Sequence, residues 1–135
     1  MVRLAAVPSD RPDLAARRPP EVGAEYRFAG WRLNLLRRDV WRPDGRPVDL
    51  TGGEFGLLCA FIERPQRVLG RAELLELARC RGGDILARAV DVQVSRLRRK
   101  LSEGDPASPE LIRTLRGRGY MFMPEATFTA NLGRF

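Results

Sequence analysis

The segment Ala89–Leu101 constrains this chain most, because on a helix it separates into two chemically opposed faces. One face is an apolar stripe with helical spacing, made of Val90, Val94, Leu97 and Leu101. The other carries a row of Ala89, Gln93, Arg96 and Lys100, flanked by Val92 and Arg99. A helix held to a core by its apolar back, with a basic, Gln-bearing front, fits a DNA major groove. The segment therefore predicts a DNA-binding module.

Composition supports this prediction and narrows the alternatives. A chain of 135 residues with 44% hydrophobic residues can form one globular domain with a short tail or linker. No apolar run approaches the roughly 18 residues of a membrane-spanning helix, and no signal peptide is visible, so we expect a cytoplasmic, nucleoid-associated protein without a membrane partner. Histidine, the commonest general base and metal ligand, is absent. Cys59 and Cys80 lack metal-ligand spacing, and we expect both to be buried small apolar residues.

The net charge of +7 is unevenly distributed along the chain. Residues 51–87 hold equal numbers of basic and acidic side chains, and residues 102–110 are acidic. Residues 88–101 carry five basic side chains against Asp91 alone, and residues 111–122 add three arginines without an acid. A charge run alone is typical of a solvated helix face. Two separated basic elements between neutral and acidic stretches favour a polyanion partner instead.

The first part of the chain divides into a tail and a sheet. Residues 1–24 contain four prolines without sustained periodicity, which predicts a flexible linker or tail. Short alternating runs from Tyr26 to Leu50 predict about four antiparallel strands. Asp44-Gly45 between the last two runs is a tight-hairpin signal.

Helices follow the sheet, and a hairpin follows the helices. Thr51-Gly-Gly-Glu54 has the form of a capping box and predicts a helix that Pro65 ends. A shorter helix is expected over Arg71 to Arg79, and the basic helix follows the break at residues 82–84. Residues 111–116 and 120–123 predict two strands around Gly117-Arg118-Gly119, whose glycines permit a tight turn.

This order predicts an α+β fold: a winged helix-turn-helix with an N-terminal four-stranded antiparallel sheet, three helices and a C-terminal β-hairpin wing. The predicted domain covers residues 25–125, followed by a C-terminal tail over residues 126–135.

Four segments in this order resemble the effector domain of OmpR/PhoB-type response regulators. They are Leu50–Leu58 at the first helix, Val68–Leu75 at the second, Ala89–Leu101 at the recognition helix and Ile112–Phe122 at the wing. The resemblance extends from Tyr26 to about Pro124. It implies a bacterial transcription regulator of the two-component type, with helix 88–101 in the major groove and wing 111–123 at the minor groove.

The resemblance also implies roles for individual residues. Gln93, Arg96 and Arg99 or Lys100 would face bases or backbone, and Arg88 would meet phosphate at the start of the helix. On the wing, Thr114 and Arg116 would contact backbone and minor groove, with Arg118 nearby. The full set of expected DNA-binding residues is Arg88, Val92, Gln93, Arg96, Arg99, Lys100, Thr114, Arg116 and Arg118.

Other conspicuous residues have structural interpretations. Arg98 lies seven residues from Asp91 on roughly the same helix face, and a structural pair between them is an alternative to DNA contact. We expect Tyr120 to brace the wing, and Trp31 and Trp41 to belong to the core or the sheet.

The family pattern includes a receiver domain with a phosphoacceptor Asp, for which this chain has no counterpart. Two interpretations stay open: an excised effector domain, or a regulator that naturally lacks a receiver. A sensor kinase is an expected partner only if a longer parent protein carries a receiver. RNA polymerase is a possible partner of the loop over residues 80–84, and the domain is expected to be a monomer alone and a dimer or tandem pair on DNA.

The leading functional hypothesis is sequence-specific binding of double-stranded DNA. The alternative is a winged-helix module whose basic face binds a protein or RNA. Gln93 favours the first, because Gln pairs bidentately with adenine in the major groove. The sequence offers no catalytic constellation, so we expect no enzyme activity, no cofactor and no metal.

Overall fold

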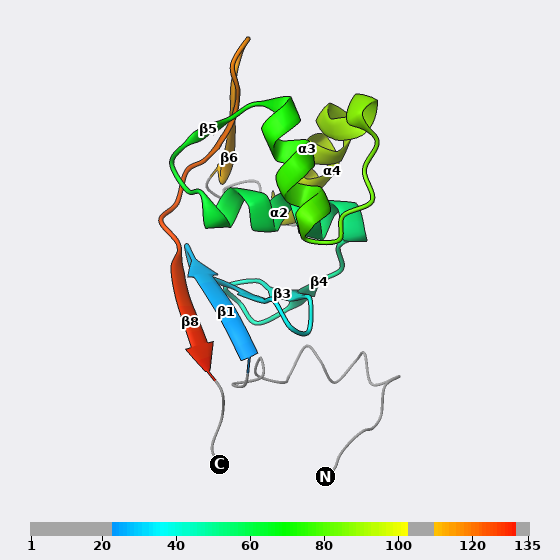
Figure 1. Ribbon diagram of the computed structural model, residues 1–135. Coiled ribbons are helices and arrows are strands. Elements are labelled where there is room, and N and C mark those ends of the chain that lie inside the picture. The colour runs from blue at the N-terminus through cyan, green and yellow to red at the C-terminus, as the bar shows by residue number, and fades with distance from the viewer. Residues whose placement is uncertain (1–22, 103–109, 132–135) are drawn as a thin grey trace. The chain divides into compact units, whose positions relative to one another are not determined.

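The computed structural model describes residues 23–102 and 110–131 (Figure 1). They form two compact units, one from the chain up to Asp49 together with the chain from Phe128 on, the other from Leu50–Thr127. Almost all of the predicted linker over residues 1–24 lies outside the described residues. Among the residues described, no helix has the length and apolarity needed to cross a membrane.

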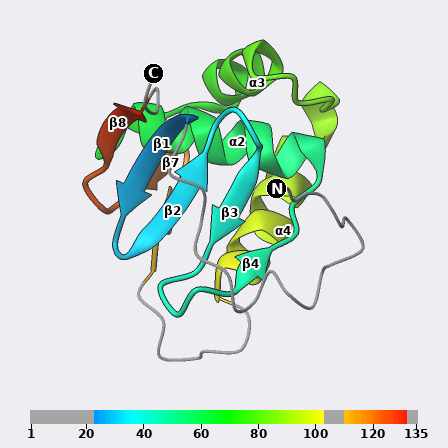
Figure 2. The same ribbon diagram turned by 90° about the horizontal axis from the view of Figure 1, so that it is seen from below.

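The first unit is an antiparallel sheet with the strand order β4-β3-β2-β1-β8 (Figure 2). Its strands are β1 (Gly23–Phe28), β2 (Trp31–Asn34), β3 (Asp39–Trp41), β4 (Pro47–Val48) and β8 (Thr127–Asn131). The predicted Asp44-Gly45 turn joins β3 to β4, with Gly45 at a φ of 91° and the Arg46 N–H donating to Asp44 Oδ1 at 3.0 Å. Trp31 and Trp41 are buried, as expected.

The strand β8 corrects two expectations. Residues 127–131 were predicted to lie in a C-terminal tail, but they form a fifth strand beside β1, so the sheet has five strands and not four. The Phe128 ring packs against the Tyr26 ring of β1 at a centroid distance of 4.9 Å. This strand was missed because its partner lies about a hundred residues earlier, and five residues without a turn signal resemble a tail.

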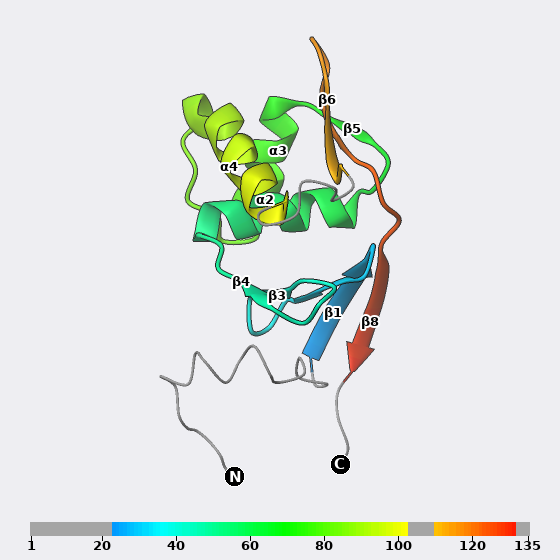
Figure 3. The same ribbon diagram turned by 180° about the vertical axis from the view of Figure 1, so that it is seen from behind.

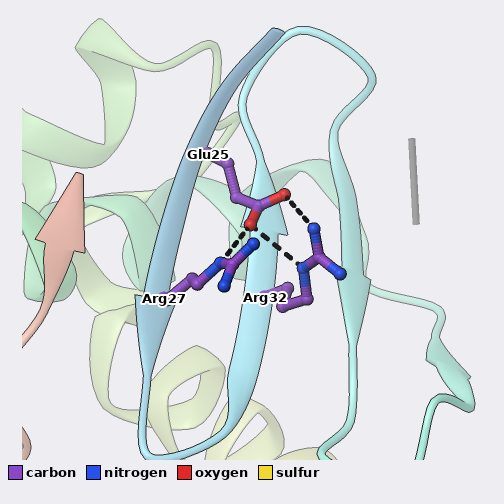
Figure 4. A network of polar contacts seen from close by, with 3 residues as sticks. All are labelled: Glu25, Arg27 and Arg32. Carbon is purple, nitrogen blue, oxygen red and sulfur yellow. Dashed lines mark hydrogen bonds and ion pairs between the residues drawn. The ribbon is translucent and has the colours of Figure 1, made fainter. Parts of the chain in front are cut away.

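One face of this sheet carries a charged cluster on β1 and β2 (Figure 4). Glu25 accepts hydrogen bonds from Arg27 Nε at 2.7 Å and from Arg32 Nε and Nη2 at 3.0 Å each. Burial alone would raise the pKa of Glu25, but the two arginines outweigh it and lower that pKa. The two arginines thus supply hydrogen-bond donors to the carboxylate of Glu25, a residue that is only 8% exposed.

The second unit contains the three predicted helices and the hairpin, the winged-helix arrangement of an α+β fold (Figure 3). Its elements are α2 (Gly52–Glu63), β5 (Val68–Leu69), α3 (Arg71–Cys80), η1 (Ala87–Ala89), α4 (Val90–Ser102), β6 (Ile112–Leu115) and β7 (Gly119–Phe122). The strands form a second sheet in the order β5-β7-β6. The recognition helix was expected over residues 88–101, and its first turn is the 3₁₀ helix η1.

The capping box begins α2 as predicted. The Thr51 side chain accepts a hydrogen bond from the Glu54 N–H at 3.2 Å, and Glu54 Oε1 accepts one from the Thr51 N–H at 2.9 Å. Every residue from Gly53 to Ile62 is buried. At Gly56 a Cβ would lie 2.7 Å from the carbonyl oxygen of Ala78, so glycine is what lets α2 and α3 approach so closely.

The cysteines divide between core and surface. Cys59 on α2 is buried, as expected, but the expectation that Cys80 is buried was wrong, because it is exposed. The buried residues of α3 are Leu74 and Ala78, one turn apart. Cys80 follows Ala78 by two residues, which places it on nearly the opposite side of the helix.

Candidate nucleic-acid interface

The two faces of α4 are arranged as its sequence pattern predicts. The residues Val90, Val94, Leu97 and Leu101 are each at most 3% exposed. α4 packs against both α2 and α3. The apolar stripe therefore orients the helix, and the opposite face is left for a partner.

The expected DNA-binding residues are mostly on the surface. Seven of them are exposed: Arg88, Val92, Arg96, Arg99, Thr114, Arg116 and Arg118. Val92 is 49% exposed, an apolar side chain among arginines. Gln93 and Lys100 are half-buried.

Five of these residues form the set that we call the open arginines: Arg88, Arg96, Arg99, Arg116 and Arg118. Within the described part of the chain, none of the five forms an ion pair, although other arginines of this unit do. They lie on η1, α4 and the turn between β6 and β7. They concentrate positive charge on the recognition helix, formed by η1 and α4, and on the wing, the two segments that the sequence predicts to bind DNA.

Gln93 has an unsatisfied polar atom beside these arginines. Its side-chain oxygen Oε1 is buried and accepts no hydrogen bond from any described residue. Buried acceptors are usually paired, because losing water without a new partner costs free energy. Because the oxygen is enclosed in this rotamer, it meets a ligand only after the side chain turns outward.

Lys100 has an intramolecular partner. Its ammonium Nζ donates to Glu54 Oε1 at 2.7 Å, where Glu54 is 2% exposed. Burial alone would raise the pKa of Glu54, but the hydrogen bonds from Lys100 and the Thr51 N–H lower it. The pair ties the end of α4 to the start of α2, which the sequence could not indicate across 46 residues.

The wing is joined to α4 through Tyr120, as expected for a bracing residue. Its hydroxyl donates to Asp91 Oδ1 at 2.5 Å, and the side chain is buried. Asp91 also accepts hydrogen bonds from Arg71 Nε at 2.9 and 2.8 Å. Hydrogen bonds from Tyr120 and then Arg71 hold the pKa of Asp91 below its ordinary value. Sequence reasoning missed Arg71, because no local pattern links it to a residue 20 positions later.

Arg98 is structural, but its partner is not Asp91. Its guanidinium Nη1 donates to Thr114 Oγ1 at 2.8 Å and to the Ile112 carbonyl oxygen at 3.2 Å. The same guanidinium lies 5.7 Å from the centroid of the Tyr120 ring, a cation–π geometry. Arg98 therefore joins α4 to both strands of the hairpin.

The described residues hold no group of three or more Asp, Glu, Cys or His side chains placed to bind a metal ion. A shallow hollow on α3, lined by Ala72, Leu75, Glu76, Arg79 and Cys80, contains no pair of groups arranged for catalysis.

Comparison with known proteins supplies the family. Residues 45–122 match the family described as "Transcriptional regulatory protein, C terminal". The regulatory protein VirG of Agrobacterium fabrum (strain C58 / ATCC 33970) is 52% identical over 97 residues, which are 72% of this chain and 38% of VirG. VirG of Rhizobium rhizogenes is 43% identical over 122 residues, or 90% of this chain and 49% of VirG. The chain thus spans less than half the length of these curated relatives.

Solved structures agree with this assignment. The DNA-binding domain of CadC from E. coli aligns with a TM-score of 0.70 at 27% identity, over 80% of this chain and 99% of CadC's. The Klebsiella pneumoniae RstA DNA-binding domain, solved in complex with the RstA box, aligns with a TM-score of 0.60 at 30% identity, over 73% and 96%. The family consists of transcriptional regulators and not of enzymes. This chain belongs to the family of transcriptional regulatory protein C-terminal domains, the winged-helix effector domains of OmpR/PhoB type.

Proposed function

We propose that this domain binds double-stranded DNA sequence-specifically and thereby controls transcription, with η1 and α4 in the major groove and the β6–β7 hairpin at the adjacent minor groove. The observation that carries this proposal is the set of open arginines on those two elements. Clustered cations without carboxylate partners repel one another, and a polyphosphate backbone removes that repulsion. The RstA and AdeR domains, which share this fold, were solved in complexes with DNA.

Two residues are suited to reading bases. The side-chain oxygen of Gln93 lacks a donor, and once the side chain turns outward the amino group of adenine supplies one while the Gln amide donates to N7. Arg96 lies one turn further along the same face, and an exposed guanidinium can make a bidentate contact with guanine. Val92 adds an exposed apolar group for a thymine methyl.

The remaining open arginines are suited to the backbone and the minor groove. Arg88 and Arg99 lie on η1 and α4, and we assign them to phosphates. Arg116 and Arg118 flank Gly117 at the hairpin turn, where an extended guanidinium reaches the minor groove. Thr114 completes the wing contact, and we assign Lys100 to positioning because its ammonium is on Glu54.

Selection from a random duplex pool, with this chain as bait, tests the proposal. A recurrent motif should emerge, and its binding constant should fall steeply with salt. If the domain neutralises about four to six phosphates, the slope of log K against log salt should be about −4 to −5. A flat salt response, or enrichment of RNA hairpins over duplexes in a mixed pool, would instead favour the protein- or RNA-binding alternative.

The proposal also covers the oligomeric state of the domain and its protein partners. Mutual repulsion between chains of charge +7 opposes association, so we propose a monomer that pairs in tandem on DNA. Sedimentation without DNA, followed by titration of one-site and two-site duplexes, tests this. We propose a sensor kinase as a partner only if a longer parent protein carries a receiver domain.

Contact with RNA polymerase through residues 80–84, and association with the nucleoid, belong to the same proposal. Cys80, Arg81 and Asp84 of this loop are exposed. Cross-linking from Cys80 to polymerase on a promoter that contains the selected motif would test the contact.

A further inference from the structure

The recognition helix and the wing are joined at two separate points. At the first turn of α4, Asp91 Oδ1 accepts a hydrogen bond from the hydroxyl of Tyr120 on β7 at 2.5 Å. Seven residues later, Arg98 donates to Thr114 and to the Ile112 carbonyl oxygen of β6. Seven residues of α-helix span about 10 Å. The two anchoring residues are therefore separated along α4, while Thr114 and Tyr120, which they hold, are register partners on β6 and β7.

Two separated attachments restrain more than one can. β7 also pairs with β5, so the hairpin is already held along one edge, and anchors from two positions of α4 further restrict the angle of its other edge and its turn. Tyr120 takes part in both attachments, because Arg98 also lies over its ring. Arg71 adds a third element by pairing with Asp91 from the start of α3. We call Asp91, Arg98, Thr114 and Tyr120 the clamp.

The clamp leaves the DNA-facing groups free. Arg98 and Asp91 direct their polar atoms at the hairpin, while Arg96 and Arg116 make no ion pair with a described residue. The Thr114 hydroxyl accepts from Arg98 and keeps its own proton to donate to a phosphate. Asp91, Arg98 and Tyr120 thus act on DNA through geometry and not through charge.

Resting on the proposed function, we propose that Asp91, Arg98 and Tyr120 are positioning residues that set the spacing between the major-groove contacts of α4 and the minor-groove contact of the wing. The domain consequently discriminates among DNA sites by the distance between the two subsites, in addition to their sequences.

The experiment begins by mapping the two subsites on the selected duplex. The helix subsite consists of the base pairs whose substitution lowers the affinity of the wild type but not that of Arg96→Ala. The wing subsite is defined in the same way with Arg116→Ala. A second duplex then carries one additional base pair between them, which displaces and rotates the wing subsite. For the wild-type domain this insertion should lower affinity about tenfold, the loss of one good contact.

The test variants are Tyr120→Phe, which removes only the hydroxyl, and Arg98→Met, which keeps the aliphatic stem. Both should bind the two duplexes with a ratio of about three or less, because the turn of the hairpin, although β7 remains paired with β5, is less restrained toward α4 and follows the displaced subsite. Arg113→Met is the matched control, since Arg113 lies on β6 but pairs with Glu110 outside the clamp. It should keep the wild-type ratio. Thermal unfolding of each variant confirms that it is folded at the assay temperature. If Arg98→Met is unfolded there, the comparison rests on Tyr120→Phe alone.

The outcomes separate the two proposals. If the clamp variants lose affinity equally on both duplexes and keep the wild-type ratio, their role is stability alone and the positioning role is overturned. If the wild type tolerates the insertion, no spacing discrimination exists and the inference also fails, while the proposed function stands. If the wild type shows no salt-dependent duplex binding, the proposed function itself fails, and this inference with it.

Discussion

The side-chain oxygen Oε1 of Glu54 accepts hydrogen bonds from the Thr51 N–H at 2.9 Å and from Lys100 Nζ at 2.7 Å, so one carboxylate both caps α2 and holds the end of α4. Lys100 is the only lysine among 24 basic residues. From the sequence it belonged to the DNA-facing row. Its partner makes it a link between the recognition helix and the core.

Lys100→Met should destabilise the fold while leaving the number of phosphate contacts unchanged. It leaves Glu54 buried with one donor fewer, and we expect a loss of about 1–2 kcal/mol in the free energy of unfolding, measured by urea titration. The salt slope of DNA binding should not change.

Arg99→Met, which alters the adjacent open arginine, provides the comparison. It should change stability little and make the salt slope shallower by about 0.9, the contribution of one phosphate contact. A shallower slope for Lys100→Met would show that Lys100 leaves Glu54 to meet DNA.

Acid should unfold the domain in part through Glu54. Because its pKa is lowered in the folded state, Glu54 contributes stability that is fully present above its unfolded pKa of about 4.3 and is lost as the pH falls through the folded pKa. Stability of the wild type should therefore decline below about pH 4.5. Glu54→Gln should be less stable at neutral pH and show a weaker decline, measured by urea midpoints across the acid range. If the stability of both proteins declines equally as the pH falls, Glu54 does not contribute to acid unfolding.

Arg96→Ala and Gln93→Ala should each reduce binding to the selected motif more than binding to random duplex. The loss of a good base contact costs about 1–3 kcal/mol of discrimination. Ser95→Ala, a change at an exposed neighbour on α4, is the control and should have little effect. Equal losses on both duplexes would mean that Arg96 and Gln93 only hold the domain on the backbone.

Val94→Asp should unfold the domain without removing any DNA contact. Val94 is fully buried on the apolar stripe, and an unpaired buried carboxylate costs about 3 kcal/mol or more. Ser95→Asp places the same group one position away at an exposed site and should leave the helical circular dichroism intact. A folded Val94→Asp that had lost only DNA binding would contradict the orientation of α4.

Local patterns were sufficient where the determining interactions lie within a few residues. The apolar spacing of α4 predicts its buried residues, because helix geometry alone places Val90, Val94 and Leu97 on one side. The Thr51-x-x-Glu54 pattern predicts the start of α2 for the same reason, since both hydrogen bonds close within one turn. The turn at Gly45 follows from the backbone freedom of glycine.

The tertiary structure determined those features that depend on contacts between residues far apart in the sequence. The sequence of Thr127–Asn131 does not reveal that β1 lies beside it, so it predicts a tail where the structure has a strand. Lys100 and Arg98 share one helix with Arg96 and Arg99, yet the fold brings Lys100 to Glu54 and Arg98 to Thr114. The periodicity of a helix determines the direction in which a charged side chain points. Whether that charge remains available to a partner depends on which groups the fold brings within hydrogen-bonding distance.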